Sequence, residues 1–206
     1  MEVDQVDVFW RTTLTFCVQI LFCIVIGLYS NISAVTQKQT EVHVVLFFTV
    51  LLLHIVCKPN SVDGLAMMKY ALLHSEEFTN PIVAFMLGWM CLTSMIIAEI
   101  VNILSSCSKT AIGEAIASFI GFKLVIDLPN LYMASNEEFP LKAAVGKLDF
   151  KRGRKSKDEV AFPGGWFFGS VYTLYYVFFK SVFFYFFPLA AVMMPFLLSL
   201  KENVKV

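Results

Sequence analysis

The chain has 206 residues and a mass of 23.3 kDa; 58% of its residues are apolar, 16% are charged, and the mean hydropathy is +0.71. Soluble domains carry about 25% charged residues, so this composition excludes an ordinary soluble domain. The 16 basic and 16 acidic side chains cancel, which gives no electrostatic reason to expect a nucleic acid partner. The five cysteines are odd in number and mostly lie in apolar runs, which favours buried thiols over a disulfide framework. The sequence therefore predicts an integral membrane protein.

Five apolar runs have about the length needed to cross a bilayer core of roughly 30 Å as helices. They cover residues 8–30, 42–57, 81–104, 111–128 and 166–187. The first run follows acidic rather than basic residues, so we expect a retained helix and not a signal peptide. The predicted fold class is all-α, a polytopic membrane protein with about five transmembrane helices in a single membrane domain over residues 1–206.

Proline and charge mark the expected ends of these helices. The Lys-Pro-Asn sequence at 58–60 is expected to end the second helix. Residues 62–78 carry apolar side chains at helical spacing among charged ones, which predicts an amphipathic helix along the membrane surface. We expect Pro81 in the first turn of the third helix, and Pro129 directly after the fourth. Two further prolines predict a kinked, interfacial or re-entrant tail over residues 188–206.

Basic residues in the connecting segments predict the orientation. With the polar loop over residues 135–165 in the cytosol, the N-terminus is cytosolic too, and nine Lys and Arg residues lie inside against four outside. The sequon at residues 31–33 then lies outside, where Asn31 is a candidate for glycosylation. The loop is expected either to contact anionic lipid head groups or only to set the topology. Its candidate head-group contacts are Lys151, Arg152, Arg154 and Lys155.

Missing motifs exclude most classes of enzyme. The chain has no phosphate-binding glycine loop, no paired CxxC, no Gly-x-Ser-x-Gly and no His-rich cluster. We therefore predict no catalytic residue, no cofactor and no metal site. His43 and His54 share one face of the second helix, a spacing that would also suit a metal or haem. The favoured interpretation is that His43 lies among head groups and that His54 makes an interhelical hydrogen bond.

Ionisable residues at membrane depth are candidates for function. Glu99 lies near the end of the third helix and Glu114 near the start of the fourth, with Asn102 one turn after Glu99. Two acids and an amide at one depth predict a cation or proton site, because neighbouring carboxylates in a dry site cannot both ionise. The alternative is that each carboxylate caps a helix or pairs with Lys109.

A second charged group is expected on the fourth helix. Lys123 and Asp127 are four residues apart, which predicts an intramembrane ion pair that lowers the cost of burying either charge. The alternative is that Lys123 extends to the head groups while Asp127 caps the end of the helix. A gate or permeation role is the less favoured interpretation.

Small residues at four-residue spacing predict where helices pack closely. The spacing occurs in the third, fourth and fifth helices, at Ala84 and Gly88, at Gly113, Ala117 and Gly121, and at Gly165 and Gly169. It predicts tight association, either within the chain or with another subunit.

The fifth helix is also rich in aromatic residues, with Lys180 among them. A packed subunit contact is the preferred interpretation of these aromatic side chains; lipid exposure and a ligand-lined cavity are the alternatives.

The stretch from Met67 to Tyr132 resembles a pattern that recurs in multi-pass membrane proteins of ciliate protists. Its elements are Met68-Lys69-Tyr70, Ser75-Glu76-Glu77-Phe78, Ile96-Ile97-Ala98-Glu99-Ile100, Ser118-Phe119-Ile120 and Val125-Ile126-Asp127. That pattern often has two consecutive acids where this chain has Asp127 and Leu128, so the resemblance implies no shared acidic site. It implies a multi-pass membrane family, and no function comes with it.

Two functions remain as hypotheses. The preferred one is a non-enzymatic subunit of a homo- or hetero-oligomeric membrane assembly, held by the small-residue stripes and the aromatic helix. The alternative is an ion channel or transporter subunit whose acidic residues line a cation path. Glu114 and Lys123 lie about 180° apart on an ideal helix, so one narrow path through a single chain does not collect both. The assembly interpretation is therefore favoured, with the lipid bilayer and other membrane subunits as the expected partners.

Overall fold

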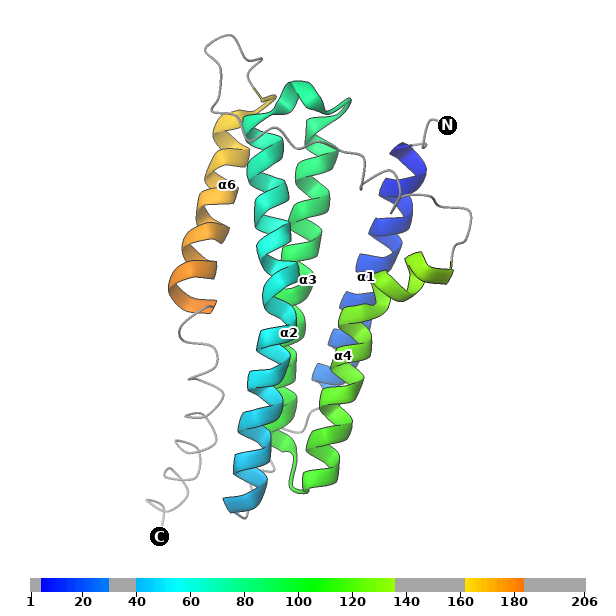
Figure 1. Ribbon diagram of the computed structural model, residues 1–206, viewed down its shortest axis with the longest axis vertical. Helices are drawn as coiled ribbons and strands as arrows, with labels where there is room; N and C mark the ends of the chain where they lie inside the picture. The colour runs from blue at the N-terminus through cyan, green and yellow to red at the C-terminus, as the bar shows by residue number, and fades with distance from the viewer. Residues whose placement is uncertain (1–4, 30–39, 136–161, 184–206) are drawn as a thin grey trace.

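The computed structural model describes residues 5–29, 40–135 and 162–183, which are helical apart from short turns and contain no strand. The helices are α1 (Gln5–Tyr29), α2 (Thr40–Leu73), α3 (Pro81–Ser108), α4 (Ile112–Ser135) and α6 (Gly165–Phe178). A short 3₁₀ turn, η1 (Ser75–Glu77), precedes α3, and a π-helical turn, η2 (Phe179–Phe183), extends α6. Successive helices alternate in direction along the long axis (Figure 1). The all-α prediction is confirmed for this part of the chain.

Three of the helices are long and apolar enough to cross a membrane: Phe9–Tyr29, Val44–Leu73 and Pro81–Ser106. On α1, large apolar side chains face away from the bundle, among them Trp10, Leu14, Leu21 and Leu28. A helix that exposes such a surface is stable in hydrocarbon and unfavourable in water. The fold therefore supports the membrane-protein interpretation with three spans. The fourth and fifth crossings remain predictions, since α4 carries three charged side chains and α6 has 14 residues in the described range.

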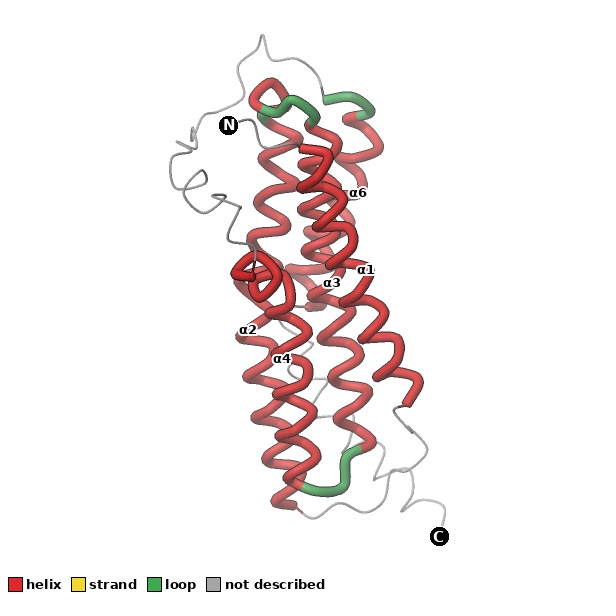
Figure 2. Tube along the Cα trace, turned by 90° about the vertical axis from the view of Figure 1, so that its right-hand side faces the viewer, coloured by secondary structure: helices red, strands yellow, loops and turns green. Residues whose placement is uncertain are grey.

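The bundle is built around the antiparallel pair α2 and α3. Helices α1 and α4 pack on one side of this pair, and α6 packs on the other (Figures 1 and 2). Two main apolar clusters fill the contacts between them. The first joins α2, α3 and α6 through residues such as Met68, Phe85 and Phe168. The second joins α1, α2, α3 and α4 through Cys23, Leu53, Met95 and Phe122.

A backbone contact between two glycines sets the alignment of α2 and α3. A Cβ atom added to Gly64 would lie 2.8 Å from the carbonyl oxygen of Gly88, and one added to Gly88 would lie 2.8 Å from that of Gly64. No residue larger than glycine fits such a crossing without moving a helix. The structure places Gly88 and the buried Ala84, two of the predicted packing residues, in the contact between α3 and α2.

The second helix does not end at Pro59. It continues to Leu73 with Pro59 inside it, so the predicted end at residue 57 and the predicted separate surface helix over residues 62–78 are both wrong. The physical reason is packing on α3. After the proline, the residues Ser61, Gly64, Leu65, Met68 and Ala71 recur at helical spacing and are all buried. Their burial stabilises the helix against the lost backbone hydrogen bond.

The fourth helix also continues past its proline, so the predicted stop before Pro129 is wrong. The last turns of α4 bend away from the rest of the helix (Figure 1). Proline has no N–H group, so the carbonyl of Val125, four residues earlier, loses its helical partner. The buried side chain of Gln19 on α1 donates to that oxygen, with Nε2 2.9 Å from it. Pro129 therefore kinks α4 and creates a docking point for α1.

Local signals explain the other helix ends. The Asn80 side chain accepts a hydrogen bond from the Val83 amide, and Pro81 occupies the first turn of α3, as predicted. Helix α6 follows Gly164, whose φ of +68° favours glycine. The predicted contacts of Lys151, Arg152, Arg154 and Lys155, the sequon at Asn31 and the tail over 188–206 lie outside the described residues.

Candidate functional site

A buried ionisable pair lies inside the bundle, between α2 and α3. His54 and Glu99 form a hydrogen bond with Nδ1 and Oε1 2.5 Å apart. The Glu99 side chain is 0% exposed and that of His54 is 8% exposed, so neither group meets bulk solvent. The prediction that His54 makes an interhelical hydrogen bond is confirmed, and its partner is the acid that the sequence singled out on the third helix.

The fold brings this pair together through the alignment of the two helices. His54 lies ten residues before Gly64, and Glu99 lies eleven residues after Gly88, so an antiparallel crossing at the glycines puts both at one depth. The second apolar cluster surrounds them, with Leu53 and Cys57 on α2, Met95 and Ala98 on α3. Apolar walls exclude water, so the hydrogen bond between the two side chains helps to compensate for burying them.

Asn102 adds an amide to the same face of α3. It lies one turn after Glu99 and is 2% exposed. Neither the second carboxylate oxygen of Glu99, Oε2, nor the amide nitrogen of Asn102, Nδ2, has a hydrogen-bond partner among the described residues. Glu99 and Asn102 thus lie on one buried face of α3, as predicted from their spacing. On this face, one hydrogen-bond acceptor, Glu99 Oε2, and one donor, Asn102 Nδ2, have no partner among the described residues.

Glu114 is not part of this group. Its side chain is exposed, and Oε2 accepts a hydrogen bond from the backbone amide of Thr110 at 3.2 Å. A carboxylate in the first turn of a helix stabilises the free amides there. The predicted three-residue set of Glu99, Asn102 and Glu114 is therefore wrong as a single site, and the helix-capping alternative describes Glu114.

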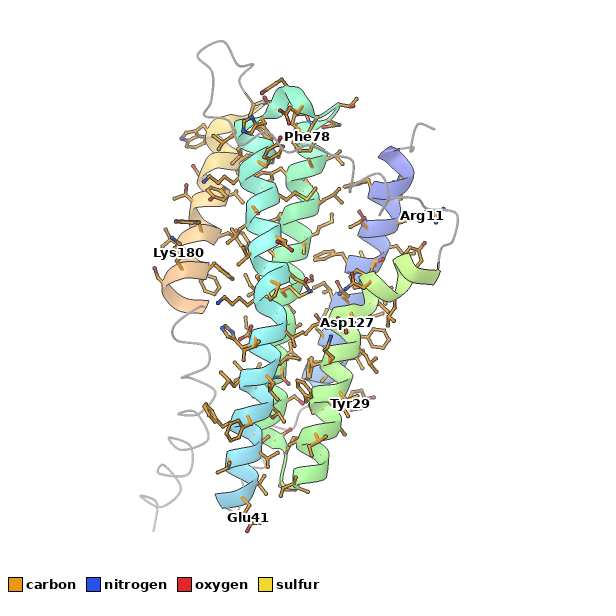
Figure 3. All side chains as sticks on the ribbon, viewed as in Figure 1. Arg11, Tyr29, Glu41, Phe78, Asp127 and Lys180 are labelled. Atoms are coloured by element: carbon orange, nitrogen blue, oxygen red, sulfur yellow. The ribbon has the colours of Figure 1, made fainter. Side chains whose placement is uncertain are left out.

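Lys123 and Asp127 form the ion pair predicted from their spacing. The ammonium group contacts Asp127 Oδ2, and the two side chains are 40% and 31% exposed. Asp127 lies on α4 where the helix begins to bend, and Lys180 lies across the bundle in η2, which extends α6 (Figure 3). The Lys180 ammonium lies 4.7 Å from the centre of the Tyr176 ring, a cation–π contact. The charged groups thus occupy separate surfaces of the molecule.

Within the described ranges, no group of three or more His, Cys, Asp or Glu side chains is arranged to hold a metal ion. The site therefore offers two chemical capabilities: the His54–Glu99 pair can hold or exchange a proton, and the spare atoms of Glu99 and Asn102 can bind a small polar molecule.

The other small-residue stripes face outward. Cβ atoms added to Gly113, Gly121 and Gly169 would meet no atom within 4 Å, and Ala117 is exposed. A Cβ atom added to Gly165 would lie 3.8 Å from the Cβ atom of Phe162 and within 4 Å of no other residue's atom. These faces of α4 and α6 do no packing within the described bundle.

Aromatic packing holds α6 by one face only. Phe168 contacts the rings of Phe85 and Phe162 with centroids 5.0 and 5.2 Å away. The Tyr175 hydroxyl lies 3.3 Å from the hydroxyl of Thr93 on α3. The opposite face, with Trp166 and Leu174, is exposed. Part of the aromatic helix thus packs inside the chain, and its other face is open.

One pairing and one residue of interest were missed from the sequence. His54 was not paired with Glu99, although their similar distances of ten and eleven residues from Gly64 and Gly88 were a signal that could have found the pair. Gln19, a lone amide in an apolar helix, was not considered, and its partner is the carbonyl that Pro129 leaves free. Polar side chains inside apolar helices are the shared signal.

Comparisons with protein-family models, with curated proteins and with solved structures find no match for the chain. The resemblance of residues 67–132 to a ciliate membrane protein pattern stays a prediction. Any function must therefore be argued from the geometry.

Proposed function

We propose that the chain is a non-enzymatic, multi-pass membrane protein that acts as a subunit of an oligomeric membrane assembly. Its proposed topology has five crossings, with the N-terminus and the basic loop over residues 135–165 in the cytosol. The observation that carries the proposal is the outward face of α4 formed by Gly113, Ala117 and Gly121, the small-residue face.

The small-residue face is open to a partner. No atom lies within 4 Å of a Cβ atom added to either glycine, and Ile116, Ile120 and Leu124 on the same helix are exposed. Small residues of this kind let a second helix approach closely in lipid, where helices associate through van der Waals packing rather than through hydrophobic burial. The same chain uses glycines in this way at the crossing of α2 and α3, where the two backbones touch.

A shallow groove on α6 supports the same proposal. The outer face of α6 is lined by Trp166, Gly169, Ser170, Thr173, Leu174 and Val177. In Figure 1 this helix lies at the left-hand edge of the bundle and α4 at the right-hand edge. Two apolar faces on opposite sides allow one subunit to contact two neighbours, as a ring or a lattice requires.

A matched pair of substitutions tests the proposal. Ala117→Ile fills the small-residue face, and Ala66→Ile makes the same change at an exposed alanine on α2. Size-exclusion chromatography with light scattering in mild detergent is expected to show an oligomer for the unchanged protein and for Ala66→Ile. Ala117→Ile is expected to lower the association constant at least tenfold, since about 1.4 kcal/mol of lost packing has that effect, and the oligomer fraction falls accordingly. A monomeric unchanged protein, or an unaffected Ala117→Ile variant, contradicts the proposal.

A cation or proton pathway is the second candidate, and the buried His54–Glu99 pair favours it. Paired ionisable groups inside a membrane bundle often belong to proton relays. In vesicles containing the purified protein, Glu99→Gln is expected to abolish any protein-dependent proton or cation flux. Glu114→Gln makes the same chemical change at an exposed carboxylate and is expected to leave the flux unchanged. Equal flux in Glu99→Gln and the unchanged protein excludes this pathway.

A further inference from the structure

The unpartnered atoms of Glu99 and Asn102 define a small binding site in the core of the bundle. The two residues lie three positions apart on α3, so their Cβ atoms are about 5–6 Å apart on one face of the helix. Glu99 is 0% exposed and Asn102 is 2% exposed, and the two spare atoms are Oε2 and Nδ2. An unpaired buried polar atom costs about 1–3 kcal/mol, so two of them together call for a ligand.

The chemistry of the two atoms selects the ligand. A carboxylate oxygen accepts hydrogen bonds, whereas the Asn102 nitrogen only donates them. A metal ion or an ammonium group would satisfy the carboxylate and leave the amide N–H facing a cation. An anion would satisfy the amide and be repelled by the carboxylate. A molecule that donates and accepts at the same time fits both, and water is the smallest such molecule.

The reach of one water molecule and the apolar surroundings also suit these two atoms. A water molecule about 2.8 Å from each atom can bridge atoms up to roughly 5.6 Å apart, and side chains one helical turn apart can bring their ends within that reach. Met95, Ala98 and Phe122 belong to the apolar cluster around the pair. Buried waters in proteins typically satisfy polar groups that have no protein partner.

We propose that one water molecule binds between Glu99 and Asn102, donating a hydrogen bond to Oε2 and accepting one from Nδ2. It extends the His54–Glu99 pair into a hydrogen-bonded chain that begins on α2 and ends one turn further along α3. This inference is independent of the proposed function, because it concerns the interior of one chain and not its outer faces.

Water contact at the Asn102 side chain tests the proposal. Protein labelled with ¹⁵N in its asparagines is placed in lipid nanodiscs, and magnetisation transfer from water to the side-chain amides is measured. Asn102→Leu assigns the Asn102 signal by its loss. A rotating-frame measurement separates a bound water from proton exchange by the sign of the cross-peak. The expected result is a water cross-peak on Asn102 with the sign of dipolar contact.

Two variants at position 99 sharpen the test. Glu99→Gln keeps an oxygen that can accept from the water, and its Asn102 cross-peak is expected to persist. Glu99→Met removes the acceptor at similar length, and its cross-peak is expected to disappear. Absence of the cross-peak in the unchanged protein overturns the proposal, and that result needs no variant to fold. A cross-peak that survives Glu99→Met also overturns it, because the water then does not depend on Glu99.

Discussion

At the scale of single residues, three polar side chains in apolar helices have specific partners. Glu99 contacts His54, Gln19 contacts the Val125 carbonyl, and Lys123 contacts Asp127. In hydrocarbon an unsatisfied polar group costs several kcal/mol, so these contacts determine how the helices align. Two of the three contacts join different helices, which makes them constraints on the tertiary structure and not only on local structure.

The contact between Gln19 and Val125 gives a prediction about α4. Gln19→Leu leaves the Val125 carbonyl without a partner and is expected to lower the free energy of unfolding in detergent by about 1–3 kcal/mol. In a Pro129→Ala background, residue 129 regains an N–H group that can bond this carbonyl. The same Gln19→Leu change is then expected to cost at least about 1 kcal/mol less. Equal costs in the two backgrounds would show that Gln19 does not compensate for the proline.

At the scale of helices, glycines divide into two groups. Gly64 and Gly88 lie in a backbone contact, whereas Gly113 and Gly121 face open space. Sequence spacing alone does not distinguish the two groups of glycines, since each glycine belongs to a helix with other small residues nearby. The difference depends on which face of each helix meets a neighbour, and this is a property of the assembled bundle.

Alanine substitutions separate the two groups by stability. Gly64→Ala puts a Cβ atom 2.8 Å from a carbonyl oxygen and is expected to destabilise the protein by about 1–3 kcal/mol. Gly121→Ala meets no atom and is expected to stabilise α4 by about 0.5–1 kcal/mol, because alanine favours helix. Both are measured by unfolding in detergent under conditions in which the protein is monomeric, so that the proposed subunit contact at Gly121 does not contribute. A larger loss for Gly121→Ala than for Gly64→Ala would contradict the observed alignment of α2 and α3.

Helix content and apolar spans could be predicted from the sequence because they depend on local composition. The ends at Pro59 and Pro129 could not, since the helices continue past both prolines through contacts with other helices. A second helix that ends at residue 57 does not include Gly64. The alignment of α2 with α3, which pairs His54 with Glu99, therefore could not be predicted. Glu99 and Asn102 were recognised as site residues because charge and amide groups are rare in apolar helices; their buried partner required the tertiary structure.

At the scale of the whole molecule, the alternating directions of the helices and the apolar outer surface of α1 fit a bundle that crosses lipid. The start of α1, the turn between α2 and α3, and the start of α6 lie at one end (Figure 1). The turn between α3 and α4 lies at the other end, and it contains Lys109. The apolar outer surface of α1 lies between these two ends. An aqueous environment would leave this surface exposed to water at a large cost in free energy.

Glycosylation mapping tests the membrane-spanning bundle most directly. One acceptor sequon with a short spacer is inserted either in the α2–α3 turn after Glu77 or in the α3–α4 turn after Lys109, in an Asn31→Gln background that removes the sequon already present. On expression with microsomal membranes, the chain with the insertion after Lys109 is expected to be glycosylated and the one with the insertion after Glu77 is not. Equal modification of the two chains, or modification of neither, would contradict a bundle whose ends lie on opposite sides of the membrane.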